Sequence, residues 1–442
     1  MQRFLDMLLA ATQPRNATGR RLMINGIRHA LEHWQIIAAW TIFLASYFVF
    51  AFGRLPATRI DRTAMAVIGA VMMFVFRILS PQSAIESIDF NTLVLLFAMM
   101  LIVASLHAAG FFDWVANRVI FHLSTRQLLP GVIFTSGVLS AFLVNDVVCL
   151  FMAPLILDIC KRMGVRPLPY PLALATASNI GGAATITGNP QNMLIGTVSG
   201  VSHRHFLAHL GPISAIGLLI DWAVISCVYL RRKETGADLP QSPAVEQTAS
   251  APANLRLLWP VIVTVAVLIG FFLGFHPPLV AAAGGALLLV RRTRDPRDIY
   301  GDVDWSLLVL FLGLFLIVGG AEQAGITSSL LEAAERLNLH HSVIFVSVVT
   351  LLSNLVSNVP AVMLLKNLIP QLQDPHTMWL MLAMSSTLAG NLTITGSVAN
   401  IIVVEKARTV THISFFEYMK TGVPITIATI LFGWLWLQFV HF

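Results

Sequence analysis

The chain has 442 residues, of which 56% are hydrophobic and only 11% are charged. Because about a quarter of the residues in a soluble domain are charged, this chain cannot cover a compact water-soluble fold with a polar surface. The 28 Lys and Arg residues exceed the 22 Asp and Glu residues, but they stand in short clusters between apolar runs. This pattern is typical of cytoplasmic loops beside anionic lipid, not of nucleic-acid binding. The composition therefore predicts a polytopic membrane protein.

The predicted spans are apolar stretches, since an α-helix needs about 20 residues to cross the hydrocarbon. After an N-terminal interfacial segment over residues 1–34, they are 35–53, 63–80, 91–110, 171–200, 209–230, 258–275, 278–291, 305–321, 378–404 and 419–440. Two further apolar stretches, 128–158 and 342–370, carry a polar cluster at their middle. They predict re-entrant helical hairpins, whose turns are tolerated only where they line protein or a water-filled cavity.

The polar segment 231–256 predicts a linker between two halves that resemble each other. Ser140–Asn145 matches Ser353–Asn358, and the pattern Thr-Ile-Thr-Gly-x-x-x-Asn that ends at Asn192 recurs ending at Asn400. Matches in the same order along both halves indicate an internal repeat, over residues 35–230 and 257–442. Each repeat holds an odd number of spans, so the second is inverted. The expected fold is an all-α polytopic membrane protein of two inverted repeats with five transmembrane helices each.

Two of the spans are interrupted at matching places. The first break contains Thr187-Gly188-Asn189-Pro190, and the second contains Thr395-Gly396-Ser397. Glycine weakens a helix, and proline removes an amide donor. A break in the middle of the membrane frees carbonyl groups that can ligate Na⁺, and it exposes a half-helix N-terminus that favours an anion. The alternative is that these glycines only allow close helix packing; their recurrence in both halves favours a binding site.

Each hairpin has polar residues at its tip, Asn145–Asp146 in the first and Ser357–Asn358 in the second. Helix capping explains the two asparagines well. A carboxylate in an apolar hairpin must instead be protonated, paired or bound to a cation, so Asp146 is predicted to be a proton or cation site. A structural cap is the alternative for Asp146. The sequence places no Arg or Lys at the site, which disfavours a multiply charged anion.

The motif that runs from Ser178 to Asn192, Ser-Asn-Ile-Gly-Gly-Ala-Ala-Thr-Ile-Thr-Gly-Asn-Pro-Gln-Asn, resembles the first broken-helix motif of the ion transporter superfamily. That superfamily includes arsenite permeases, divalent-anion/sodium symporters and one class of sodium/proton antiporters. The tip Phe142–Asp146 is closer to the branch of arsenite permeases and anion permeases. The sodium/dicarboxylate branch has Ser-Asn-Thr at each tip, from which this chain departs. The resemblance covers about residues 35–440.

The resemblance implies a homodimer of elevator type, with a static scaffold domain and a moving transport domain. The scaffold would hold residues 35–110 and 258–321, and the transport domain would hold the hairpins and broken helices. The candidate substrate- and ion-binding residues, hairpin tips included, are Asn145, Asp146, Thr187, Gly188, Asn189, Asn192, Ser357, Asn358, Thr395, Gly396, Ser397 and Asn400. A coupling Na⁺ would be held at Asn145, Asp146, Gly188, Asn358 and Gly396.

These features predict a secondary active transporter of a small anion or an arsenite-like hydroxide, coupled to H⁺ or Na⁺. The alternative is a sodium/proton antiporter that moves no anion. An enzyme is not expected, because the chain lacks a His-Glu-x-x-His zinc motif, paired intramembrane aspartates and a Gly-x-x-x-x-Gly-Lys nucleotide loop. No cofactor is expected other than the coupling ion, and a separate ATPase subunit stays open. The expected location is the inner membrane of a bacterial cell.

Overall fold

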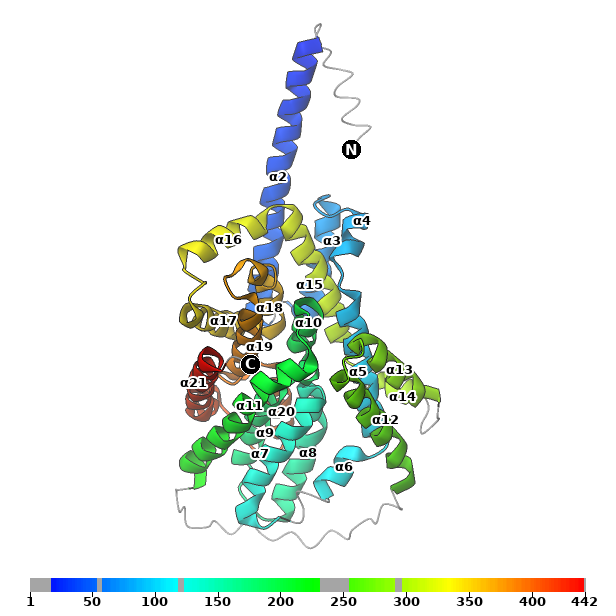
Figure 1. Ribbon diagram of the computed structural model, residues 1–442, viewed down its shortest axis with the longest axis vertical. Helices are drawn as coiled ribbons and strands as arrows, with labels where there is room; N and C mark the ends of the chain where they lie inside the picture. The colour runs from blue at the N-terminus through cyan, green and yellow to red at the C-terminus, as the bar shows by residue number, and fades with distance from the viewer. Residues whose placement is uncertain (1–16, 54–57, 118–122, 231–253, 291–295, 441–442) are drawn as a thin grey trace.

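The computed structural model describes residues 17–53, 58–117, 123–230, 254–290 and 296–440. All regular secondary structure in these residues is helical (Figure 1), which confirms the predicted fold class. Of the predicted interfacial segment and linker, residues 1–16 and 231–253 lie outside the described residues. Among the described helices, those long and apolar enough to cross a membrane are Trp34–Phe52, Phe90–Ala108, His203–Tyr229, Trp305–Gln323 and Phe415–Phe439.

The first repeat contains a hairpin, a broken helix and the helices that surround them. Its helices are α2 (Ala17–Phe52), α3 (Arg62–Val75), α4 (Pro81–Ser87), α5 (Phe90–Ala108), α6 (Phe111–Val115), α7 (Thr125–Phe142), α8 (Asn145–Arg162), α9 (Pro169–Gly182), η2 (Ile186–Gly188), α10 (Pro190–Ser199), α11 (His203–Ile225) and the π-helical turn η3 (Ser226–Leu230). The hairpin is α7 and α8, and the broken helix is α9 and α10 with the 3₁₀ turn η2 between them.

The second repeat has the same order of elements. Its helices are α12 (Asn254–Phe272), α13 (Pro277–Val290), α14 (Pro296–Gly301), α15 (Trp305–Gln323), α16 (Ile326–Arg336), α17 (Ser342–Val356), α18 (Asn358–Leu365), η4 (Ile369–Gln371), α19 (Pro375–Ala389), η5 (Ile394–Gly396), α20 (Val398–Ala407) and α21 (Phe415–Phe439). Here the hairpin is α17 and α18, and the broken helix is α19 and α20. Local capping is also repeated: Asp89 accepts a hydrogen bond from Thr92 N at the start of α5, and Asp304 accepts one from Leu307 N at the start of α15.

The helices pack as two groups. In the scaffold group, α3 lies against α15, α5 lies against α13, and α2 and α12 pack beside these pairs. In the hairpin group, each hairpin packs on the first half of its own broken helix, and α11 lies along α21. The scaffold contact is close, because a Cβ atom at Gly313 of α15 would stand 2.7 Å from the Ala66 backbone of α3. The observed packing thus contains a scaffold group and a hairpin group, which are the two parts of the predicted fold.

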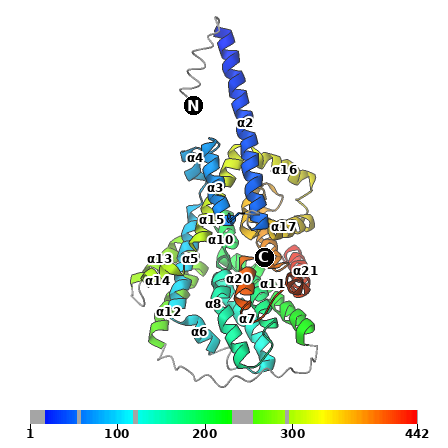
Figure 2. The same ribbon diagram turned by 180° about the vertical axis from the view of Figure 1, so that it is seen from behind.

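The two hairpins occupy opposite ends of the hairpin group, as Figures 1 and 2 show. The first hairpin turns at Leu143–Val144 and the second at Ser357, and residues of both tips line one cavity. Two similar modules that enter from opposite ends and meet at their tips are the inverted repeats that the sequence predicted. The functional site is therefore sought where the tips and the helix breaks come together.

Candidate substrate and ion site

One asparagine closes each helix break. Asn192 Nδ2 donates hydrogen bonds to the carbonyl oxygens of Gly182 (3.2 Å) and Thr185 (3.1 Å). Asn400 Nδ2 donates to the carbonyl oxygens of Gly390 (2.6 Å) and Thr393 (3.0 Å) at the equivalent places of the second repeat. The last carbonyls of a helix lack partners within the helix. The final Asn of each Thr-Ile-Thr-Gly-x-x-x-Asn motif therefore holds the broken ends together, a structural role beside the binding role predicted for it.

The motif glycines lie where the chain returns to the end of the first half-helix. A Cβ atom at Gly188 would be 2.3 Å from Gly182 O, and one at Gly396 would be 2.9 Å from Gly390 O. Only glycine permits so close an approach of two backbone segments. These glycines allow the break to be compact instead of a wide loop.

Asn179, in the last turn of α9, joins the two repeats. Its Nδ2 donates to Asn391 Oδ1 (2.8 Å) and Asn400 Oδ1 (2.9 Å). Its Oδ1 accepts from Asn145 Nδ2 (3.0 Å) at the first hairpin tip and from Ser397 Oγ (3.0 Å) at the second break. A fully buried amide with every bond satisfied rigidifies its surroundings. Asn179 is not among the site residues predicted above, although it is the second residue of the motif Ser178–Asn192.

Thr387 of α19 forms the matching contact from the second repeat. Its hydroxyl accepts hydrogen bonds from Asn189 Nδ2 and Gln191 Nε2, both at 3.2 Å. With its side-chain amide oriented to suit its neighbours, Asn358 accepts a further bond from Gln191 Nε2 at 3.2 Å and donates to Gly396 O at 3.1 Å. The residues from both breaks and from the second hairpin tip thus belong to one network.

A cavity of about 50 Å³ lies in front of this network, where the hairpin tips meet. Since a single water needs roughly 10–15 Å³, it has room for a few waters or one small solute. It is lined by Arg62, Asn145, Asp146, Pro190, Gln191, Leu307, Leu310, Ser357, Asn358, Val359, Pro360, Ser397 and Val398. The cavity is small, and most of its polar lining groups are amides and hydroxyls.

The predicted site residues fall into two layers. The cavity is lined by Asn145, Asp146, Ser357, Asn358 and Ser397. A second layer lies buried behind it and consists of Thr187, Gly188, Asn189, Asn192, Gly396 and Asn400. Thr395 is exposed and is not among the lining residues; its hydroxyl lies 3.3 Å from that of Thr393. The hairpin tips thus line the cavity, and most of the motif residues lie buried behind it.

Arg62, the first residue of α3, brings a positive charge to the cavity from the scaffold group. Its Nε donates to Phe50 O at 3.0 Å, which fixes the side chain. The expectation that no Arg or Lys stands at the site is therefore wrong. Arg62 belongs to a basic cluster that resembles an ordinary loop in the sequence, and only the tertiary fold brings the start of α3 to the cavity.

Asp146 supplies the negative charge of the cavity. It lies in the first turn of α8, where the helix dipole favours an anion, and beside the amide of Ala399 in the first turn of α20. Next to it, the buried Asn145 Oδ1 has no hydrogen-bond partner among the described residues. A free acceptor oxygen beside a carboxylate is suited to bind a cation, which fits the predicted Na⁺ ligands at this tip.

Comparisons with known proteins agree with this architecture. A 46 kDa membrane protein of Mycobacterium leprae (strain TN) is 30% identical over 434 residues, which cover 91% of this chain and 99% of that protein. The silicon efflux transporter LSI3 of Oryza sativa subsp. japonica is 29% identical over 452 residues, with 86% and 93% covered. The crystal structure of the YdaH transporter of Alcanivorax borkumensis has a similar fold, with a TM-score of 0.55, 13% identity, and 93% and 99% covered.

The sequence profile of the citrate transporter family, CitMHS, matches residues 47–384, which is most of the chain. The resemblance to the ion transporter superfamily is thereby confirmed. Inverted repeats, paired helix breaks and a cavity between them are features of many secondary transporters. This chain belongs to the CitMHS citrate transporter family and is a secondary transporter.

Proposed function

We propose that this chain transports a small uncharged hydroxide of the arsenite or silicic acid class, driven by a gradient of H⁺ or Na⁺. The observation that supports this most is the charge of the cavity. Its lining holds one guanidinium, Arg62, and one carboxylate, Asp146, which together are close to neutral. A tricarboxylate such as citrate requires an excess of positive charge, because uncompensated charge in a desolvated site is costly.

The rest of the lining suits a solute that carries several hydroxyl groups. Ser357, Asn358, Ser397 and Gln191 offer amides and hydroxyls, which both donate and accept hydrogen bonds. A hydroxide of arsenic or silicon presents the same mixture of donors and acceptors in a compact shape. The cavity volume of about 50 Å³ also favours such a solute over a larger organic anion. The rice relative is named as a silicon efflux transporter, which agrees with this class of substrate.

The two charges of the cavity come from different helix groups. Arg62 belongs to the scaffold group and Asp146 to the hairpin group, so a sliding motion of one group against the other would separate them. In this proposal the hairpin group carries the solute and the coupling ion together, with Asp146 as the residue that binds the ion. The site can then open first to one side of the membrane and then to the other without any change in the hydrogen-bond network behind the cavity.

The second candidate function is sodium/proton antiport without a solute. The observation in its favour is the unpartnered Asn145 Oδ1 beside Asp146, which together could bind Na⁺ and H⁺ alternately. An antiporter of this kind produces Na⁺-dependent proton flux in vesicles that contain no arsenite, silicic acid or carboxylate. A transporter of a hydroxide does not.

Counterflow in proteoliposomes tests the proposal. Vesicles with the purified protein are loaded in turn with arsenite, silicic acid or citrate, and uptake of the labelled compound is measured against empty vesicles. We expect counterflow with arsenite or silicic acid and none with citrate. Counterflow with citrate alone would refute the proposed substrate class, and Na⁺-dependent proton flux with no solute would establish the second candidate.

A further inference from the structure

A second carboxylate is buried inside the hairpin group. Asp221 of α11 has an exposed fraction of 0%, and neither of its carboxylate oxygens has a hydrogen-bond partner among the described residues. An ionised carboxylate without a partner is strongly unfavourable in an apolar interior. Ionisable residues within membrane helices are rare, and they commonly mark ion pathways or proton relays. Asp221 is outside the cavity described above, and neither the sequence analysis nor the proposed function gives it a role.

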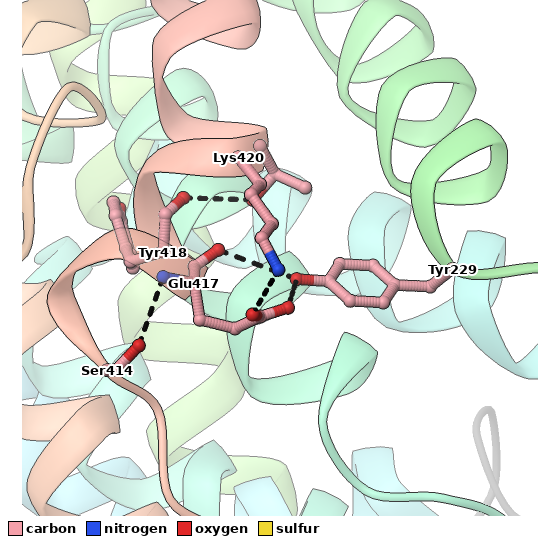
Figure 3. Close-up of polar contacts among 6 residues, drawn as sticks. Tyr229, Ser414, Glu417, Tyr418 and Lys420 are labelled. Atoms are coloured by element: carbon pink, nitrogen blue, oxygen red, sulfur yellow. Dashed lines mark hydrogen bonds and ion pairs between the residues drawn. The ribbon is translucent and has the colours of Figure 1, made fainter.

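The position of Asp221 follows from the pairing of α11 with α21. These helices run side by side in opposite directions: a Cβ atom at Gly217 would be 3.4 Å from Thr429, and Tyr229 near the other end of α11 donates to Glu417 Oε1 at 2.7 Å. Figure 3 shows the latter contact. Asp221 lies one turn after Gly217 on the same face, because residues four apart are neighbours on a helix. Its carboxylate is therefore enclosed by α11 and α21.

The third wall around Asp221 is α9. The hydroxyl of Thr176 lies beside the carboxylate, but it donates its hydrogen to Leu172 O at 2.8 Å. On α21, Tyr418 is close enough to Asp221 to interact with it electrostatically; it is fully buried, and its hydroxyl also lacks a partner among the described residues. Tyr418 interacts in the same way with Cys149 of α8. Neither Thr176 nor Tyr418 carries a positive charge that would neutralise Asp221.

The charged side chains of Glu417 and Lys420, at one end of the pair of helices α11 and α21, already have hydrogen-bond partners. Glu417 accepts from Tyr229 and from Lys420 Nζ at 2.5 Å, as Figure 3 shows. In the described parts of α7, α12 and α19, which also pack against α11, no side chain forms an ion pair or hydrogen bond with Asp221. A buried carboxylate without a cationic neighbour is stable when one of its oxygens carries a proton. A bound Na⁺ needs several oxygen ligands, whereas the side-chain oxygens found near Asp221 in the described residues are those of Thr176 and Tyr418.

A ladder of buried amides connects this place to the first hairpin tip. The carbonyl of Thr176 accepts from Asn391 Nδ2 at 3.1 Å. Asn391 Oδ1 accepts from Asn179 Nδ2 at 2.8 Å, and Asn179 Oδ1 accepts from Asn145 Nδ2 at 3.0 Å. Each step is a hydrogen bond of ordinary length between buried groups. A shift of α9 at Thr176 is therefore transmitted to the residue that precedes Asp146.

We propose that Asp221 is a second ion-binding site of this transporter, that its ion is a proton, and that the ladder couples its protonation to the hairpin tip. When the proton leaves to water, the carboxylate requires a donor, and the Thr176 hydroxyl can turn from Leu172 O to supply one. That turn loosens the α9 segment that carries the ladder. The inference goes beyond the proposed function, in which the coupling ion binds at Asp146.

Infrared spectroscopy of the purified protein in lipid vesicles tests the proton directly, without a solute. We expect the carbonyl band of a protonated carboxylic acid in apolar surroundings in the wild type and in Asp146→Asn, and its loss in Asp221→Asn. Asn has nearly the shape and the neutrality of a protonated Asp, so this variant should fold. In Asp221→Glu the band should shift and not vanish. Persistence of the band in Asp221→Asn, or its removal by Na⁺ at constant pH, would overturn the assignment.

The coupling is tested in proteoliposomes with arsenite as the probe. The quantity measured is the ratio of arsenite uptake with a pH gradient to uptake without one, which does not depend on how much protein is active. We expect a ratio of tenfold or more in the wild type and a ratio near one in Asp221→Asn. An unchanged ratio in the variant contradicts the coupling. If the wild type moves no arsenite, the proposed substrate is wrong, and the infrared result decides the role of Asp221 independently.

Discussion

The two hairpin tips have the same place in the fold but differ in backbone and in charge. The first tip turns through Val144 at a φ of −61°, an ordinary value, and continues to a carboxylate at Asp146. The second turns through Ser357 at a φ of +78° and continues to Asn358 and the apolar Val359. The contacts that close the helix breaks behind the tips are, in contrast, nearly identical. The internal repeat thus contains the hydrogen bonds that close the helix break in both halves, whereas only the first tip carries a charged side chain.

A physical reason for this asymmetry is the size of the cavity. Both tips line the same small space, so carboxylates on both would place two like charges close together in a desolvated site. A single carboxylate beside one guanidinium, Arg62, avoids that repulsion. The difference between the tips therefore separates residues that perform transport from residues that maintain the shape, and the following variants test this separation.

The largest expected effect is that of Asp146→Asn. We expect coupled transport in proteoliposomes to fall to the background, because the variant removes the only carboxylate of the cavity. Folding should be retained, since Asp146 is partly exposed and its replacement has the same size. The matched control on the same helix is Asp158→Asn, which changes a half-exposed partner of Arg162 and should transport normally. Transport by Asp146→Asn at the wild-type rate would show that the carboxylate of the first tip is not required for transport.

Arg62→Gln should have the next largest effect. A hydrogen bond to a charged group contributes about 1.5–3 kcal/mol, so loss of the guanidinium should weaken solute binding on the order of tenfold or more. Binding is measured as the concentration of arsenite or silicic acid that half-saturates counterflow. Arg59→Gln, in the same basic cluster but exposed, is the control and should leave that concentration unchanged. An equal effect of both variants would mean that only the net charge of the loop matters.

Asn192→Ala and Asn400→Ala should be similar to each other, because the two side chains make equivalent bonds. Each variant removes two hydrogen bonds to backbone carbonyls, at about 0.5–1.5 kcal/mol per bond, so both should lower the melting temperature clearly and impair transport. Asn400→Ala also removes one of the two acceptors of Asn179 Nδ2, at 2.9 Å. Asn192→Ala removes a longer contact from Thr387, at 3.4 Å, so Asn400→Ala should be somewhat worse. Asn367→Ala, which loses one long contact of 3.4 Å, is the control. A stable, fully active pair of variants would contradict the structural role.

The sequence was sufficient to predict the repeats, both hairpins and both breaks, because those features depend on local residue patterns that occur twice. It did not predict Asn179, since the equivalent position of the second repeat holds Thr387 and a comparison of the halves gives no signal there. It did not predict Arg62 at the cavity, because that depends on the packing of a scaffold helix against the hairpin tips. Asp221 is visible as an acidic residue in a span, but its burial depends on which face of α11 meets α21.

The motif glycines should differ in sensitivity although their motifs are alike. A Cβ atom at Gly188 would meet only backbone atoms of Gly182, at 2.3 Å and slightly more, and these cannot move aside. A Cβ atom at Gly396 would first meet the side-chain nitrogen of Asn354 at 2.5 Å, which can rotate away. Overpacking costs about 1–3 kcal/mol, and we expect Gly188→Ala at the upper end of that range and Gly396→Ala at the lower end.

Thermal unfolding of the purified variants measures this difference. Gly301→Ala is the control, because a Cβ atom there would meet nothing within 4 Å and its backbone conformation suits any residue. It should leave the melting temperature unchanged. The reverse order, with Gly396→Ala the less stable of the two motif variants, would mean that the second break is the more tightly packed one.

The smallest expected effect is the relief of backbone strain at the second tip, and the corresponding change at the first tip has the opposite sign. Ser357 has a φ of +78° and a ψ of 157°, a conformation that costs a residue other than glycine about 1–3 kcal/mol. Ser357→Gly should remove most of that strain, less the entropy that glycine loses on folding, about 0.5–1 kcal/mol, so the melting temperature should rise slightly. Val144→Gly should lower it, because the turn is unstrained and the variant also removes a fully buried side chain. A decrease in both variants would show that the second tip is not strained, and the difference between the two tips would then lie in their charge alone.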